Sequence, residues 1–128
     1  MTALCLLAGG TSLRFAAGLL TLAWTHSVEK VEWRETWGAT PAGLELVEAR
    51  VKGSGAGMEP GEGARLEDGW WVWRPMRPAL PELRLARSGA TADWRVCLDG
   101  ACRPLGESLG PAHDAETVRL APCDATPP

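Results

Sequence analysis

The sequence predicts an all-β fold, a single mostly antiparallel domain built as a sandwich or a partly open barrel. Short segments along the chain alternate apolar and polar residues, which is the period of a strand with one buried face. Fifteen glycines and ten prolines are spread along the chain and cut it into pieces of strand length. No window of about 11 residues carries the three-to-four apolar spacing of an amphipathic helix.

The expected strands recur at the spacing of about 8–12 residues that is typical of all-β domains. They are Leu4–Ala8, Leu19–Val28, Val31–Trp37, Leu44–Lys52, Trp70–Arg74, Leu83–Ser88, Trp94–Leu98 and Val118–Ala121. A Gly-Gly turn follows the first strand, and Met58–Gly69 and Gly106–Asp114 are expected to be loops. At roughly 100–200 residues per domain, the 128 residues form one domain, placed at 1–125, with a frayed tail at 126–128.

Composition and charge exclude several classes of protein. Apolar residues make up 45% and charged residues 23%, so the chain is too apolar for a disordered segment. A net charge of −3 argues against a nucleic-acid partner, which calls for a basic face. The longest uncharged runs, Met1–Leu13 and Phe15–Val28, are shorter than the roughly 18 residues of a membrane span. No export signal is recognisable, so we expect the chain to start within its own domain.

One predicted hairpin places two ionisable residues on an apolar face. Pairing Val28 with Val31 puts nearly all apolar residues of the hairpin on one side. The resulting pairs are His26–Trp33, Trp24–Glu35 and Leu22–Trp37, with Ser27–Glu32 and Thr25–Arg34 on the other side. His26 and Glu35 become diagonal neighbours about 7–8 Å apart. They form a satisfied polar pair at the core edge, or a site that carries a proton or contacts a ligand; the third alternative is that the hairpin has a different register.

A catalytic triad is not expected. His26 and Ser27 are adjacent in a strand and point to opposite faces, so the imidazole cannot activate the hydroxyl. His113, the other histidine, falls in an expected loop with no obvious nucleophile beside it.

A glycine-rich stretch, Gly53-Ser54-Gly55-Ala56-Gly57-Met58, follows a strand as phosphate-binding loops do. It lacks the Gly-Lys-Ser/Thr ending of a P-loop and the last glycine of the dinucleotide fingerprint, and no helix pattern follows it. Neither a nucleotide nor any other cofactor is therefore expected. The stretch is either a tight bend or a loop whose bare backbone lines a ligand site.

The four cysteines predict disulfides. Asp99-Gly100 is a preferred two-residue turn, and it places Cys97 and Cys102 in a non-hydrogen-bonded pair about 4.5 Å apart at Cα, where a bridge is feasible. Cys5 and Cys123, in the first and last strands, can form a second bridge. Free thiols and a four-cysteine zinc site are the alternatives, although a flat hairpin is not a zinc knuckle. Disulfides imply an oxidising compartment.

Tryptophan is over-used, with seven residues against one Phe and no Tyr. Trp24, Trp33 and Trp37 fall on the predicted inner face of the hairpin, where they fill a core. Three more, Trp70, Trp71 and Trp73, alternate across one strand, so at least one of them packs under a loop or lies exposed. An exposed aromatic patch for a ligand or partner is the alternative.

Two motifs carry a resemblance to a known family. The run Leu22-Ala23-Trp24-Thr25-His26-Ser27-Val28-Glu29-Lys30, with Glu35 downstream, and the stretch Gly53–Met58 resemble the signatures of a small bacterial family, domain of unknown function 1850. The resemblance runs from the first strand to Leu98. It implies an association with TAXI-type TRAP transporters, importers of small organic acids, and a periplasmic location, with a cytoplasmic location as the alternative. It carries over the motif positions His26, Ser27, Glu29, Glu35, Gly55, Gly57 and Met58 as candidate ligand- or partner-binding residues.

The function expected from these observations is a non-enzymatic accessory or binding protein of such an importer, with transporter subunits or their solute-binding protein as partners. One alternative is a small hydrolase or isomerase that uses His26 and Glu35 as acid and base. The other is a β-sandwich that binds a glycan or peptide through Trp70, Trp71 or Trp73. No metal is expected.

Overall fold

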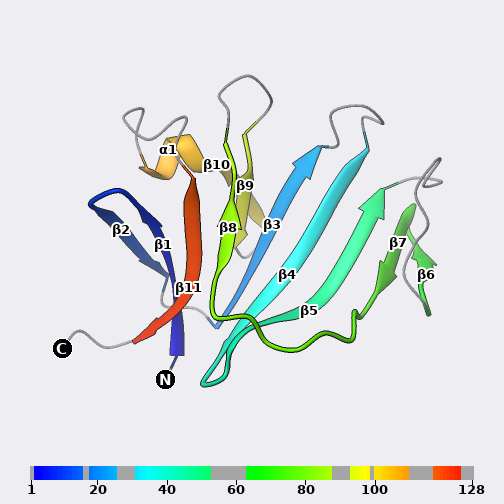
Figure 1. Cartoon of the computed structure of the whole chain (residues 1–128). Helices are drawn as coiled ribbons and strands as arrows, with labels where there is room; N and C mark the ends of the chain where they lie inside the picture. Colours follow the sequence, from blue (N-terminus) through cyan, green and yellow to red (C-terminus); the bar gives the residue numbers. More distant parts are fainter. Residues whose placement is uncertain are drawn as a thin grey trace.

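The computed structural model describes residues 2–15, 18–25, 31–52, 63–87, 93–98, 100–109 and 117–124. Two antiparallel sheets face each other without closing into a barrel (Figure 1). The smaller sheet has four strands in the order β2-β1-β11-β8, and the larger has seven in the order β10-β9-β3-β4-β5-β7-β6. The predicted all-β, sandwich-like fold is confirmed. Among the described residues, no helix is long and apolar enough to cross a membrane.

The two sheets draw their strands from different parts of the chain. The smaller sheet contains β1 (Thr2–Ala8), β2 (Thr11–Phe15), β8 (Leu83–Leu85) and β11 (Val118–Asp124). The larger contains β3 (Leu19–Thr25), β4 (Glu32–Thr40), β5 (Gly43–Lys52), β6 (Arg65–Glu67), β7 (Trp70–Trp73), β9 (Arg95–Leu98) and β10 (Ala101–Pro104). The described helix, α1 (Leu105–Leu109), is a single short segment.

Three elements were not expected from the sequence. Strand β6 lies inside the predicted loop Met58–Gly69, and its three residues are all exposed, so it has no burial pattern to read. Strand β2 follows the Gly9-Gly10 turn and pairs back on β1, with Ala8 opposite Thr11. Helix α1 covers the start of the predicted loop Gly106–Asp114 and is too short to show a helical period.

The core lies between the two sheets and is mainly aliphatic. Residues from β1, β11 and β8 pack against residues from β3, β4, β5 and β9, with α1 closing one end. Its largest fully buried side chains are Leu4, Leu6, Leu20, Leu22, Leu44, Leu85, Leu105, Leu120 and Val118. Each sheet therefore has an inner face in the core and an outer face turned away from it.

Both predicted disulfides are present, and they use all four cysteines. Cys5–Cys123 joins the first strand to the last across 118 residues. Cys97–Cys102 crosses the β9–β10 hairpin, whose register pairs Leu98 with Ala101 and Cys97 with Cys102 as expected. Its Cα–Cα distance is 4.0 Å, and Gly100 has the positive φ of 83° that the turn requires.

A partly buried ion pair ties the segment after β8 to the segment before β9. The Arg87 side chain, 4% exposed, donates two hydrogen bonds to the Asp93 carboxylate at 2.8 and 2.9 Å. The same carboxylate accepts the backbone N–H groups of Trp94 and Gly106. Because each carboxylate oxygen has partners, the cost of burying the charge is offset and the three segments are held together.

The predicted register of the β3–β4 hairpin is wrong by two residues. Trp24 pairs with Trp33, Leu22 with Glu35 and Leu20 with Trp37, and the last described pair is Thr25–Glu32. Since side chains alternate with a period of two, a two-residue shift leaves every side chain on its predicted face, and the apolar pattern cannot tell the registers apart. Cross-strand pairs decide between them. The rings of Trp24 and Trp33 stack at 6.1 Å, and the hydroxyls of Thr21 and Thr36 hydrogen-bond at 2.8 Å.

Candidate functional site

The structure describes one of the predicted binding residues. Glu35 lies on β4, and the remaining six fall outside the described residues: His26, Ser27, Glu29, Gly55, Gly57 and Met58. The predicted contact between His26 and Glu35, and the predicted approach of the glycine-rich loop to His26, therefore stay predictions.

Glu35 occupies the inner face of the larger sheet, as predicted. Its direct cross-strand partners are Leu22 on β3 and Ala49 on β5. Trp33 and Trp37 lie two residues to either side on the same face of β4. The carboxylate is thus surrounded by apolar and aromatic side chains, and within the described part of the chain it makes no ion pair.

These surroundings raise the pKa of Glu35 above its usual value. Burial is the main cause, and the Trp37 indole and the positive charge of Arg77 lower the pKa by less. The indole N–H groups of Trp33 and Trp37 are both buried; that of Trp37 acts on the Glu35 carboxylate, whereas that of Trp33 completes no hydrogen bond with another described residue. The Glu35 carboxylate and the Trp33 indole N–H therefore lie along one strand with hydrogen-bonding capacity that a polar ligand can complete.

Four tryptophans form a continuous row across this inner face, which we call the tryptophan row: Trp94, Trp24, Trp33 and Trp73. Trp94 precedes β9, and its ring centroid lies 4.9 Å from that of Trp24. Trp24 stacks on Trp33 with an angle of 11° between the ring planes. Trp33 meets Trp73 edge-on at 6.0 Å, across the small residues of β5. All four side chains are half-buried, so the row is neither a closed core nor a free surface.

The place of the row in the fold explains its partial exposure. The larger sheet continues through the end of β5 and through β7 and β6 beyond the smaller sheet, whereas the start of β5 lies in the core (Figure 1). Trp37, on the covered part of β4, is 3% exposed and belongs to the aliphatic core. Trp33 and Trp73 lie toward the overhanging strands. Extended aromatic faces beside a carboxylate suit the binding of a ligand with both apolar and polar groups.

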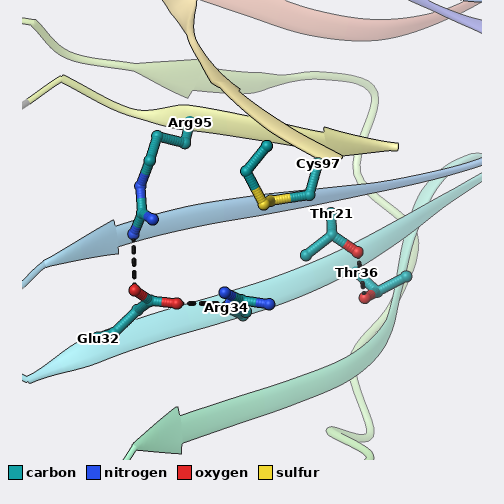
Figure 2. A network of polar contacts seen from close by, with 7 residues as sticks. Thr21, Glu32, Arg34, Thr36, Arg95 and Cys97 are labelled. Atoms are coloured by element: carbon teal, nitrogen blue, oxygen red, sulfur yellow. Dashed lines mark hydrogen bonds and ion pairs between the residues drawn. A yellow bond between two sulfur atoms is a disulfide. The ribbon is translucent and has the colours of Figure 1, made fainter. Parts of the chain in front are cut away.

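The outer face of the same sheet is charged. Glu32 accepts a hydrogen bond from Arg34 at 2.6 Å and another from Arg95 at 2.9 Å, joining β4 to β9 across β3 (Figure 2). Burial raises the pKa of Glu32, but the two arginines outweigh it and the net pKa is lowered. The Thr21–Thr36 hydrogen bond and the Cys97–Cys102 disulfide lie on this face as well (Figure 2).

The family model that matches this chain is Domain of unknown function (DUF1850), over residues 20–105. The match spans β3 to β10, which is well over half of the 128 residues, and it includes both motifs singled out in the sequence. The chain belongs to the DUF1850 family. Among curated proteins and among solved structures, no significant match was found.

Two further features of this DUF1850 domain bear on its chemistry. In the part of the chain that the structure describes, no group of three or more His, Cys, Asp or Glu side chains is placed to hold a metal ion. A shallow recess of about 450 Å³ lies on the smaller sheet, lined by Leu7, Gly9, Arg84, Ala86, Thr117 and Arg119. Glu82 already pairs with both arginines of this recess, at 3.0 and 3.6 Å.

Sequence reasoning placed Trp24, Trp33 and Glu35 on one face but missed their neighbours. Trp73 and Trp94 join the row from β7 and from the residue before β9, and Arg77 acts on Glu35 from the segment after β7. The excess of tryptophan was the available signal. It does not reveal which rings meet, because that depends on the order of strands in the sheet.

Proposed function

We propose that this DUF1850 domain is a non-enzymatic binding protein of an extracytoplasmic compartment, the periplasm, acting as an accessory of a TAXI-type TRAP importer. The importer assignment rests on the resemblance of the motifs around His26 and the Gly53–Met58 stretch. The disulfides support the compartment, and the tryptophan row with Glu35 supports a binding role.

The disulfides support the compartment. All four cysteines are paired, and one bridge links the two ends of the chain. Stable disulfides are typical of oxidising environments outside the cytoplasm and are uncommon in the reducing cytosol.

The tryptophan row carries the proposal of binding. Aromatic rings bury much apolar area when they pack, so half-buried rings in contact along one face leave area that a ligand or partner can cover. Glu35 and the indole N–H of Trp33 add polar groups beside that area. A binding site with an aromatic wall and few polar groups is the common arrangement for small organic ligands.

A second candidate is an acid–base enzyme that uses Glu35 with His26. The raised pKa of Glu35 favours it, since a general acid is most effective when its pKa lies near the working pH. The described partners of Glu35 across the strands, Leu22 and Ala49, do not titrate. A binding role needs no second titrating group, and for this reason we prefer it.

Co-purification tests the importer assignment. The tagged domain is expressed in the periplasm of a host that carries a TAXI-type importer, and complexes are cross-linked before solubilisation. We expect the importer's solute-binding protein or its membrane subunits to be recovered with the domain. Binding of the purified solute-binding protein is then measured by calorimetry. Absence of both associations would contradict the proposal.

Paired variants separate binding from catalysis. We expect Trp24→Ala to weaken binding of the partner or its solute. The Glu35→Gln variant should keep at least part of the wild-type binding. Trp71→Ala is the matched control, because Trp71 is also half-buried on the inner face but lies outside the row. If the wild-type domain turns over an organic-acid derivative and the Glu35→Gln variant does not, the enzyme is the correct assignment.

A further inference from the structure

Four arginines far apart in the sequence form one straight row across the outer face of the larger sheet. Register places Arg95 opposite Ala23, Ala23 opposite Arg34, and Arg34 opposite Arg50. The line continues from Arg50 through Val72 to Arg65 on β6. We call Arg95, Arg34, Arg50 and Arg65 the arginine row. At about 4.8 Å between strands, it spans roughly 24 Å from β9 to β6.

This arrangement works against stability. Like charges directly opposite each other on neighbouring strands repel, and Arg34 and Arg50 form such a pair. The structure offsets part of the repulsion with carboxylates in the adjoining positions. Glu32 pairs with Arg34 and Arg95, and Glu48 pairs with Arg50 at 3.2 Å.

The carboxylates offset only part of the repulsion, and the arginine row keeps an excess of positive charge. One carboxylate, Glu32, is shared between two arginines. Lys52 lies beside the row and has no ion pair within the described residues. With Lys52 included, five cations adjoin the three carboxylates Glu32, Glu48 and Glu67, an excess of two positive charges on a chain whose net charge is −3.

Trp70 lies within this charged surface. Its ring faces Arg34 and Lys52, each with its charged group 5.0 Å from the ring centroid. Trp and Arg are the residues most enriched where protein interfaces hold most of their binding energy. The half-buried arginines are also restrained by their ion pairs, with 30% to 34% of the side chains of Arg95, Arg34 and Arg50 exposed, so little side-chain entropy is lost when a partner binds.

We propose that the arginine row, with Lys52 and Trp70, is a docking surface for an acidic segment or surface of a protein partner. The proposal deepens the proposed function, on which it rests for the identity of the partner. Carboxylates spaced along the row would pair with the guanidinium groups, and an apolar group would cover Trp70. Nothing in the described chain packs on this face as the smaller sheet packs on the inner one.

The mixed charge favours a protein over other anionic partners. Lipid headgroups and nucleic acids present closely spaced negative charge, which the three interspersed carboxylates would repel. A protein surface can place its own cations against Glu32, Glu48 and Glu67 and its carboxylates against the arginines.

The first experiment maps the surface with a twelve-residue poly-glutamate peptide. Nuclear magnetic resonance titration should shift signals from the outward positions of β4, β5 and β7, together with the Trp70 indole, and high salt should reverse the shifts. Shifts spread over the whole molecule, or confined to the recess at Arg84 and Arg119, would overturn the proposal. The proposal would also be overturned if phosphatidylglycerol vesicles or a DNA duplex bound more tightly than the peptide and shifted the signals of the same residues.

The second experiment compares two charge-matched double variants. Lys52→Glu with Arg65→Glu changes exposed residues of the docking surface, and Arg84→Glu with Arg103→Glu makes the same change in net charge elsewhere on exposed side chains. We expect the first pair to weaken peptide binding about tenfold or more and the control pair less than about threefold. Equal losses would show that net charge alone attracts the peptide. Trp70→Ala should weaken binding with no change in charge.

The same variants, tested against the purified solute-binding protein of the importer, separate this proposal from the proposed function. If the wild-type domain binds that protein and the Lys52 and Arg65 variant binds equally well, the docking surface is wrong and the importer assignment stands. If the wild-type domain does not bind it but the peptide still maps to the arginine row, the importer assignment is wrong and the docking surface stands.

Discussion

Glu32 and Glu35 lie three residues apart on β4, on opposite faces of the larger sheet, and their pKa values shift in opposite directions. On the inner face, burial among apolar residues raises the pKa of Glu35. On the outer face, two arginines lower the pKa of Glu32 even though burial opposes them. Two carboxyl groups of the same kind thus have pKa values shifted in opposite directions, because successive side chains of a strand point to opposite faces of the sheet and meet different environments.

The two faces also differ in what holds them together. The inner face is stabilised by packing, with aliphatic side chains under the smaller sheet and the tryptophan row beyond it. The outer face is held by ion pairs within β4 and β5, by an ion pair from β4 to β9, and by a hydroxyl pair and a disulfide between neighbouring strands. Packing depends on shape and buried area, whereas ionic links depend on pH and salt. Perturbations of each kind should therefore affect the two faces differently.

The largest effect is expected from the covalent links on the outer faces. Loss of Cys5–Cys123 frees a loop of 118 residues and should cost about 5 kcal/mol of unfolding free energy, by the loop-entropy relation. Loss of Cys97–Cys102, with a separation of 5, should cost about 2 kcal/mol. Denaturant unfolding of the two Cys→Ser double variants measures both. Equal losses would mean that local geometry, not loop length, sets the stabilisation.

The next comparison is between two tryptophans. Trp37→Ala opens a cavity in the core beneath the smaller sheet and should cost about 3–5 kcal/mol. Trp70→Ala, on the outer face, removes two contacts with cations and should cost less than about 2 kcal/mol. Thermal and denaturant unfolding give the two values. A larger loss at Trp70 would reverse the assignment of faces.

A smaller effect is expected when the outer carboxylate is neutralised. Glu32→Gln removes the charge shared by Arg34 and Arg95 and should cost about 1 kcal/mol at neutral pH. Because the folded pKa is below the unfolded value of 4.5, the stabilisation is present above 4.5 and is lost as pH falls through the lowered pKa. Melting temperatures from pH 3 to 7 should therefore show a shallower acid limb in the variant. Thr25→Ala, at the neighbouring outer position, is the control.

The smallest effect, and one of opposite sign, is expected for Glu35→Gln. The folded pKa lies above the unfolded value of 4.5, so the folded state binds more protons, and stability falls as pH rises through that window. Glutamine removes this loss, and the variant should match or slightly exceed the wild type in melting temperature above the raised pKa. Marked destabilisation at pH 7 by Glu35→Gln would show that the carboxylate has a partner that stabilises its charge.

Much of the fold could be predicted from local pattern. Alternation identified most strands and the inner positions of Trp24, Trp33 and Trp37, and Asp99-Gly100 fixed the pairing of Cys97 with Cys102. The short elements β6 and α1 were not predicted, because three to five residues are too few to show the apolar period of a strand or a helix. The β3–β4 register was predicted wrongly for another reason, because a shift by two residues leaves the alternation of apolar and polar residues unchanged.

Of the candidate site, the sequence indicated Glu35 and an excess of tryptophan but not their arrangement. Trp73 and Trp94 reach the row only because β7 and β9 lie on either side of the β3–β4–β5 group in the sheet. The arginine row has the same origin. Positions 34, 50, 65 and 95 have no regular spacing in the chain, and they align because the registers of five strand pairings bring them onto one line.

The sequence by itself determined the period of most strands, the faces of the β3–β4 hairpin and the local hairpin that closes Cys97–Cys102. These properties depend on neighbours within a few residues, through side-chain alternation and turn geometry. Tertiary structure alone decided which strands adjoin, and hence which tryptophans touch, which arginines align and which carboxylate is buried. Those outcomes depend on long-range pairing, where the free energy of packing and of cross-strand contacts selects among registers that the local pattern leaves equivalent.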